Sequence, residues 1–175
     1  MEQQVKQVPY GVADFAKVMT QNLYYVDKTM FLPELEKQPR NLFFIRPRRF
    51  GKSIFLSMLY SYYDCNQKSK FEKLFGSLWI GQHPTALQGK YQVLFLDFSQ
   101  ITGKIDILEE RFNAYLSINL DAFVRQYAQY YQEEKDEILS KTNYADKLEL
   151  VFKAAKAHEY PLYLIIDEYD NFTNV

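Results

Sequence analysis

The feature that most constrains this chain is an apolar run that leads into a Gly-Lys-Ser tripeptide and then into a helical pattern. Residues 41–45 are predicted to form a β-strand, and Gly51, Lys52 and Ser53 follow after a short basic loop. From residue 52 to 64, apolar residues recur at steps of three and four, which predicts a helix with one apolar face. A strand, a loop and a Gly-Lys-Ser helix start are typical of a segment that binds phosphate groups.

The start of such a helix favours an anion. Its first N–H groups have no partner inside the helix, and the helix dipole is positive at that end. Lys52 would reach the β- and γ-phosphates of a nucleotide, and the Ser53 hydroxyl would hold Mg²⁺. The tripeptide alone is equally compatible with a capped surface helix after a basic turn, so a second signal is needed.

The loop departs from the usual spacing at its first position. Arg46 stands where a glycine is expected, and the adjacent Pro47 has no N–H to donate. Arginine side chains in the loop would offset this by presenting positive charge to an anion. The predicted nucleotide-binding residues are Arg46, Arg48, Arg49, Phe50, Gly51, Lys52, Ser53 and Ile54.

The second signal lies close to the end of the chain. Residues 162–166 form an apolar strand pattern that ends in Asp167 and Glu168. In phosphate-loop ATPases an aspartate at this position holds Mg²⁺, and a neighbouring glutamate polarises the attacking water. A solvated acidic turn is the alternative for this half alone. The two halves together, in this order, predict a nucleotide site with Lys52 and Glu168 as catalytic residues and Ser53 and Asp167 as metal ligands.

Composition limits the other function classes. A formal net charge of −1 argues against wholesale electrostatic binding of nucleic acid, although a local arginine patch is compatible with it. The single cysteine, Cys65, rules out an intramolecular disulfide and suits a reducing compartment. No apolar run approaches the roughly 20 residues of a membrane span, and the N-terminus lacks a signal-peptide core. A cytoplasmic protein is therefore expected.

The remaining pattern predicts an α/β fold with a parallel sheet flanked by helices. The expected strands cover 41–45, 91–98 and 162–166, and the expected helices 14–19, 31–37, 52–64, 70–75, 105–139 and 144–158. Three further groups have two interpretations each. Residues 27–29 would close over the base or ribose, or would form a structural ion pair or turn. Asp97 and Ser99 would support the ligand site or cap a helix. The tyrosines at 127–131 are expected to pack in the core and not to stack on bases.

Several segments carry a family resemblance. Pro9-Tyr10-Gly11, the run 24–29, the block Arg46-Pro47-Arg48-Arg49-Phe50-Gly51-Lys52-Ser53, the run 95–99 and the run 165–170 resemble the AAA-ATPase-like family. The resemblance covers nearly the whole chain. The resemblance also implies that an arginine at position 46 is normal.

The resemblance implies an additional-strand P-loop NTPase fold with Mg-ATP as ligand. Gly51, Lys52 and Ser53 would be the phosphate-loop residues, Asp167 the metal aspartate and Glu168 the water-activating glutamate. Residues 1–40 would form an N-terminal extension, and 41–175 the P-loop core through the Asp-Glu strand. Family members often carry a C-terminal PD-(D/E)xK nuclease-like domain.

The chain stops at Val175, where the resemblance implies a further central strand with a sensor residue and an arginine finger. We therefore expect an N-terminal portion with an incomplete sheet: a fragment, a truncated form or a split reading frame. Its predicted function is binding of ATP and Mg²⁺, with hydrolysis in a longer or complemented protein. The alternatives are a non-hydrolysing nucleotide-regulated switch and, ranked last, a nucleic-acid-binding domain. A homo-oligomer or the nuclease-like domain are the expected partners besides nucleotide.

Overall fold

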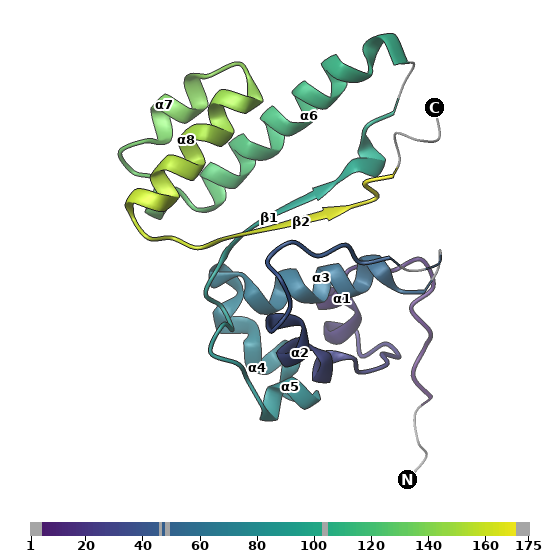
Figure 1. The fold of residues 1–175 in the computed structure, drawn as a ribbon. Coiled ribbons are helices and arrows are strands. Elements are labelled where there is room, and N and C mark those ends of the chain that lie inside the picture. The colour runs from purple at the N-terminus through teal and green to yellow at the C-terminus, as the bar shows by residue number, and fades with distance from the viewer. Residues whose placement is uncertain (1–4, 46, 48–49, 103–104, 171–175) are drawn as a thin grey trace. The chain divides into compact units, whose positions relative to one another are not determined.

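The computed structural model describes residues 5–45, 47, 50–102 and 105–170 (Figure 1). The chain divides into two compact units, Met1–Lys90 and Tyr91–Val175. The first unit holds both the expected N-terminal extension and the Gly-Lys-Ser segment. The boundary expected at residue 41 stays a prediction.

The first unit is helical throughout its regular elements. These are α1 (Phe15–Thr20), η1 (Thr29–Phe31), α2 (Leu32–Glu36), α3 (Lys52–Tyr63), η2 (Cys65–Lys70), α4 (Phe71–Phe75) and α5 (Trp79–Gln82). α1 begins after Asp14, whose side chain accepts a hydrogen bond from the Lys17 N–H at 3.0 Å, the arrangement of an N-cap. The helices predicted at 14–19, 31–37, 52–64 and 70–75 are thereby confirmed.

The core of the first unit is aromatic and forms around α3. Met58 and Tyr62 of α3 are fully buried, as are Phe15 of α1 and Phe75 of α4. The Phe15 ring lies 4.9 Å from that of Phe75, and the Phe15 N–H donates to Ser57 Oγ at 3.0 Å. α1 contacts the middle of α3 through Ser57, and α4 packs its aromatic rings against Tyr62 near the end of α3.

The second unit contains a parallel pair of strands. Its elements are β1 (Gln92–Asp97), η3 (Phe98–Gln100), α6 (Ile105–Gln126), η4 (Ala128–Tyr130), α7 (Lys135–Ser140), α8 (Tyr144–Ala157) and β2 (Leu162–Asp167). β1 and β2 are hydrogen-bonded in parallel, with Gln92 opposite Leu162 and Asp97 opposite Asp167. Leu96 and Phe98 pack against Leu116 of α6. This confirms an α/β chain with a parallel sheet flanked by helices.

Tyrosine hydroxyl groups from the α6 region bind the backbone of β1. The N–H of Val93 donates to the Tyr127 hydroxyl at 2.9 Å, and the N–H of Asp97 donates to the Tyr115 hydroxyl at 2.8 Å. Tyr131 donates to the Gln92 side-chain oxygen at 2.6 Å. Tyr127 and Tyr131 are fully buried, which confirms that these tyrosines pack in the core.

Two sequence predictions were wrong. Residues 41–45 form no strand, and Phe43 and Ile45 are each 80% exposed. A strand needs a neighbouring ladder to pair its N–H and C=O groups, and the described residues offer none to this segment. The helix predicted over 105–139 ends at Gln126, and the next residue, Tyr127, accepts a hydrogen bond from the Val93 N–H of β1.

Candidate functional site

The start of α3 is a helix N-terminus with a glycine at its N-cap position. Gly51 is the N-cap residue and has φ 79° and ψ 29°, a left-handed conformation that favours glycine. The first hydrogen bond of the helix runs from the Phe55 N–H to the Gly51 carbonyl at 3.1 Å. The N–H groups of Ser53 and Ile54 have no partner in the described part of the chain, and no side chain caps the helix. These donors are therefore available to an anion.

The predicted loop residues divide into described and undescribed ones. Phe50 is 61% exposed immediately before the glycine, and Lys52, Ser53 and Ile54 form the half-buried first turn of α3. The three predicted arginines, Arg46, Arg48 and Arg49, lie outside the described residues.

Residues 27–29, for which two interpretations were open, take a structural role at two of their three positions. Asp27 Oδ1 accepts from the Thr29 N–H at 2.8 Å and from the Thr29 hydroxyl at 2.7 Å. Asp27 Oδ2 accepts from the Trp79 N–H at 2.7 Å, and Thr29 Oγ1 accepts from the Ile80 N–H at 3.1 Å. The Asp27 and Thr29 side chains thus cap α5 by accepting hydrogen bonds from its first two N–H groups.

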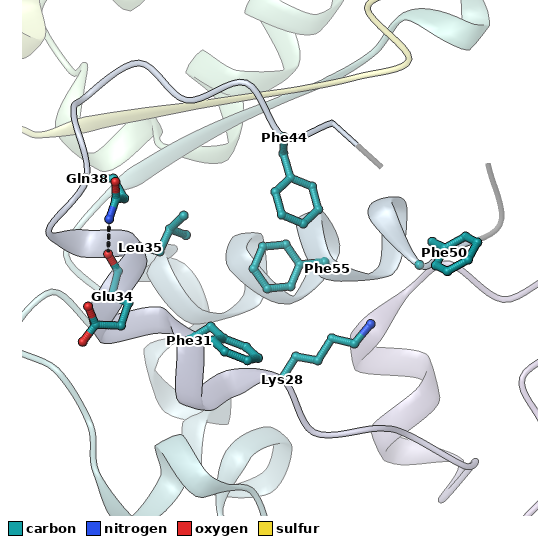
Figure 2. Close-up of a pocket in the computed structure, with 9 residues that line it drawn as sticks. Lys28, Phe31, Glu34, Leu35, Gln38, Phe44, Phe50 and Phe55 are labelled. Atoms are coloured by element: carbon teal, nitrogen blue, oxygen red, sulfur yellow. Dashed lines mark hydrogen bonds between the residues drawn. The ribbon is translucent and has the colours of Figure 1, made fainter. Parts of the chain in front are cut away.

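Lys28, between them, projects to the start of α3 instead. Its side chain extends toward Phe50 (Figure 2), and its Nζ lies 4.0 Å from the position that a Cβ on Gly51 would occupy. Within the described residues Lys28 has no ion-pair partner. The sequence indicated Lys28 only as one member of a triplet, so its place beside the Gly-Lys-Ser turn could not be anticipated from local pattern.

Asp167 and Glu168 stand at the carboxyl end of β2, as predicted. Asp167 Oδ1 accepts from the Glu168 N–H at 2.9 Å, and Glu168 has φ 51°, a left-handed conformation uncommon for a non-glycine residue. The backbone therefore turns sharply at Glu168, the residue that follows the strand.

Asp97 occupies the same end of β1 and binds its own backbone. Its Oδ1 accepts from the Ser99 N–H at 2.9 Å, which makes Asp97 the N-cap of η3. This supports helix capping, one of the two interpretations of Asp97 and Ser99. Burial raises the pKa of Tyr115, whose hydroxyl accepts from the Asp97 N–H; that bond lowers the pKa in part, and the Asp97 carboxylate raises it further.

The two predicted half-sites belong to different units, and each is described by itself. Gly51, Lys52, Ser53 and Ile54 are in the first unit, and Asp167 and Glu168 in the second. Among the described residues, no three His, Cys, Asp or Glu side chains are grouped to hold a metal ion. The Ser53 hydroxyl and the Asp167 carboxylate, each in its own unit, offer oxygen atoms, which are the donor type that Mg²⁺ prefers.

The histidines have local partners. His83 stacks on Trp79 with ring centroids 4.4 Å apart, and His158 Nε2 lies 2.7 Å from Glu134 Oε1. Neither histidine belongs to the candidate site. The helices that the structure describes include none that is long and apolar enough to cross a bilayer.

Comparison with known proteins gives the family. A family profile described as a predicted AAA-ATPase matches residues 9–175. The chain is 32% identical over 173 residues to the "Uncharacterized protein in vnfD 5'region" of Azotobacter chroococcum mcd 1. That alignment covers 94% of this chain and 29% of the relative, so the chain spans less than a third of the relative's length. No solved structure matches. Since the profile covers nearly the whole chain, the protein belongs to the AAA-ATPase-like family of predicted AAA-ATPases.

Proposed function

We propose that the chain is the ATP-binding module of a Mg²⁺-dependent P-loop ATPase. The observation that carries the proposal is the left-handed Gly51 before α3, which leaves the N–H groups of Ser53 and Ile54 without a partner in the described residues. A triphosphate matches this turn, because it supplies the oxygen acceptors that the donors lack and the negative charge that the helix dipole favours. Family membership supports a nucleotide as the source of that phosphate.

The predicted site residues have separate roles in binding and hydrolysis. Lys52 stabilises the charge of the β- and γ-phosphates, and Ser53 and Asp167 hold Mg²⁺. Glu168 orients the water that attacks the γ-phosphate, and Arg46, Arg48 and Arg49 provide further positive charge. When bound, Mg²⁺ would neutralise phosphate charge as it develops. The fold that we infer for this module is the additional-strand P-loop type.

Binding and turnover make separate demands. Binding needs the turn at Gly51 and its lysine, whereas turnover also needs the Glu168 carboxylate at the attacking water. The two activities are therefore tested with different variants, and loss of one does not imply loss of the other.

The test is calorimetric titration of ATP with and without Mg²⁺. We expect Lys52→Ala to abolish detectable binding, because it removes the cation from the phosphate turn. Lys135→Ala is a matched control, since Lys135 is the first residue of another helix, α7, in the second unit. Equal ATP affinity for wild type and Lys52→Ala would remove the argument for the site.

Turnover is tested by phosphate release from the protein or from a longer form that hydrolyses ATP. Glu168→Gln is expected to stop release while ATP affinity stays within about twofold of wild type. Glu159→Gln is the control, because Glu159 also has a left-handed backbone, with φ 56°. Unchanged release in Glu168→Gln would contradict the assigned role of this carboxylate and favour the nucleotide-regulated switch.

A further inference from the structure

A cavity in the first unit opens beside the start of α3. Its volume is about 220 Å³, and its lining includes Lys28, Phe31, Leu35, Phe44, Phe50 and Phe55 (Figure 2). Every lining residue belongs to the first unit, so the cavity is a property of that unit alone. The sequence analysis did not find it, because its walls come from three separate segments: η1 with α2, the run before the loop, and α3.

Four of the nine residues that line the cavity are phenylalanines. Phe44 and Phe55 stack with centroids 4.9 Å apart and an angle of 16° between their planes. Phe31 and Phe50 keep 57% and 61% of their surface exposed, although both line the cavity. Exposed phenylalanines beside a hollow of this shape provide stacking faces for a planar ring, which is how proteins hold nucleobases without hydrogen-bond selection.

One end of the cavity is cationic. The Lys28 ammonium lies at the side where Gly51 begins the helix turn, 4.0 Å from the Cβ position of that glycine. Gly51 itself lines the cavity. The same hollow therefore joins an aromatic region to a positive charge beside Gly51, the N-cap residue of α3. A ligand that fits both regions has a planar ring at one end and an anion at the other.

The volume limits which part of such a ligand can enter. Sites that enclose a drug-sized ligand usually measure roughly 300–1,000 Å³, so about 220 Å³ suits one part of a nucleotide. The base is the part that would fit, because the phosphates would bind outside the cavity, at the N–H groups of Ser53 and Ile54.

We propose that this cavity receives the base of the bound nucleotide, with Lys28 contacting the phosphate chain. The inference rests on the proposed ATP-binding function and adds the place of the base and a second phosphate-side cation. Stacking on phenylalanine accepts any planar base, so the site would favour nucleotides over inorganic polyphosphate more strongly than it would favour adenine over other bases.

The first experiment compares ATP with inorganic tripolyphosphate by calorimetric titration. Phe31→Ala is expected to weaken ATP binding roughly 5- to 100-fold, the range for loss of one stacked base, and to leave tripolyphosphate affinity unchanged. Phe43→Ala is the control, since Phe43 is 80% exposed and does not line the cavity. Equal ATP affinity in wild type and Phe31→Ala, or an equal loss for both ligands, would overturn the proposal.

A second variant gives an optical readout that does not depend on loss of binding. Phe31→Trp places an indole at the cavity mouth, in a background where Trp79→Phe removes the natural tryptophan. ATP should change the fluorescence of this indole by stacking on it, whereas tripolyphosphate at saturation should not. No ATP-induced change at a saturating ATP concentration would contradict base binding here.

Lys28→Met tests the cationic end. It should weaken ATP and tripolyphosphate by similar factors, because Lys28 is assigned to the phosphates and not to the base. A loss confined to ATP would contradict that assignment. Failure of the proposed function would look different from failure of this inference, since wild-type protein would then bind neither ATP nor tripolyphosphate.

Discussion

Asp97 and Asp167 are register partners at the carboxyl ends of β1 and β2. Because the strands are parallel, both residues end their strands at the same edge of the sheet, the edge where ligands bind in open α/β sheets. Their tasks differ within the described structure: Asp97 caps the turn that contains Ser99, and Asp167 accepts from the N–H of Glu168. The sequence motif predicts a role for Asp167, and the strand register shows that Asp97 is its neighbour on β1.

The first prediction separates these two aspartates. Asp167→Asn should remove most of the effect of Mg²⁺ on ATP affinity, because the substitution deletes the proposed anionic metal ligand. Asp97→Asn should leave the effect of Mg²⁺ intact, since asparagine caps a helix about as well as aspartate. Titrations of ATP with and without Mg²⁺ measure the difference. A larger effect from Asp97→Asn would assign the metal to β1.

The second prediction concerns the backbone of the turn at Gly51, where we propose that phosphate binds. Gly51→Ala should lower the free energy of unfolding by about 1–2 kcal/mol, because alanine is strained at φ 79°. Space is not the obstacle, as a Cβ would meet Ile54 Cγ2 at 3.4 Å, which is ordinary contact. Gly51→Asn should cost less, since asparagine tolerates the left-handed region. Urea denaturation checks both values, and equal costs for the two variants would contradict a conformational origin.

The third prediction tests the structural role given to residues 27–29. Thr29→Val should destabilise the first unit by about 1–3 kcal/mol, because it leaves the Ile80 N–H without its acceptor at a fully buried position. Thr20→Val is the comparison, since the Thr20 hydroxyl donates to the Ala16 carbonyl on an exposed part of α1. ATP affinity of folded Thr29→Val should match wild type. If Thr29→Val weakened ATP binding without lowering stability, Thr29 would have to be assigned to the ligand site instead.

The fourth prediction follows from the raised pKa of Tyr115. A tyrosine in the unfolded chain loses its proton near pH 10, whereas folded Tyr115 keeps its proton to a higher pH. The folded state then binds more protons than the unfolded state, so stability falls as pH rises above about 10. Tyr115→Phe should show a shallower alkaline fall and, at neutral pH, lower stability from the lost bond to the Asp97 N–H. Urea unfolding between pH 8 and 11 compares the slopes, and identical slopes would contradict the assignment.

Local signals predicted the elements that are stabilised locally. Asp14 marked the start of α1, and the three- and four-residue steps after Gly51 marked α3. Continuous apolar runs gave β1 and β2, which do pair in parallel. In each of these cases the pattern that can be seen in the sequence is the same one that stabilises the element.

The features that failed depend on distant partners. The run 41–45 has strand composition but no ladder among the described residues, so composition alone could not decide its state. The aromatic stripe of α6 continues past Gln126 in the sequence, yet the helix ends there, and the Tyr127 hydroxyl binds the distant Val93 N–H. The positions of Lys28 and Phe31 beside Gly51 arise from packing between residues at least 20 positions apart in the sequence. The predicted catalytic and metal residues remain predictions.

The hydroxyl groups of Tyr115 and Tyr127 also determine where the sheet can grow. They occupy the N–H groups of Asp97 and Val93 that point away from β2, which are the groups that an incoming strand would need. This flank of β1 is thus sealed by side chains, a protection against edge-to-edge aggregation. A strand added beside β1 would have to displace both tyrosine hydroxyls, whereas a strand added beside β2 would not.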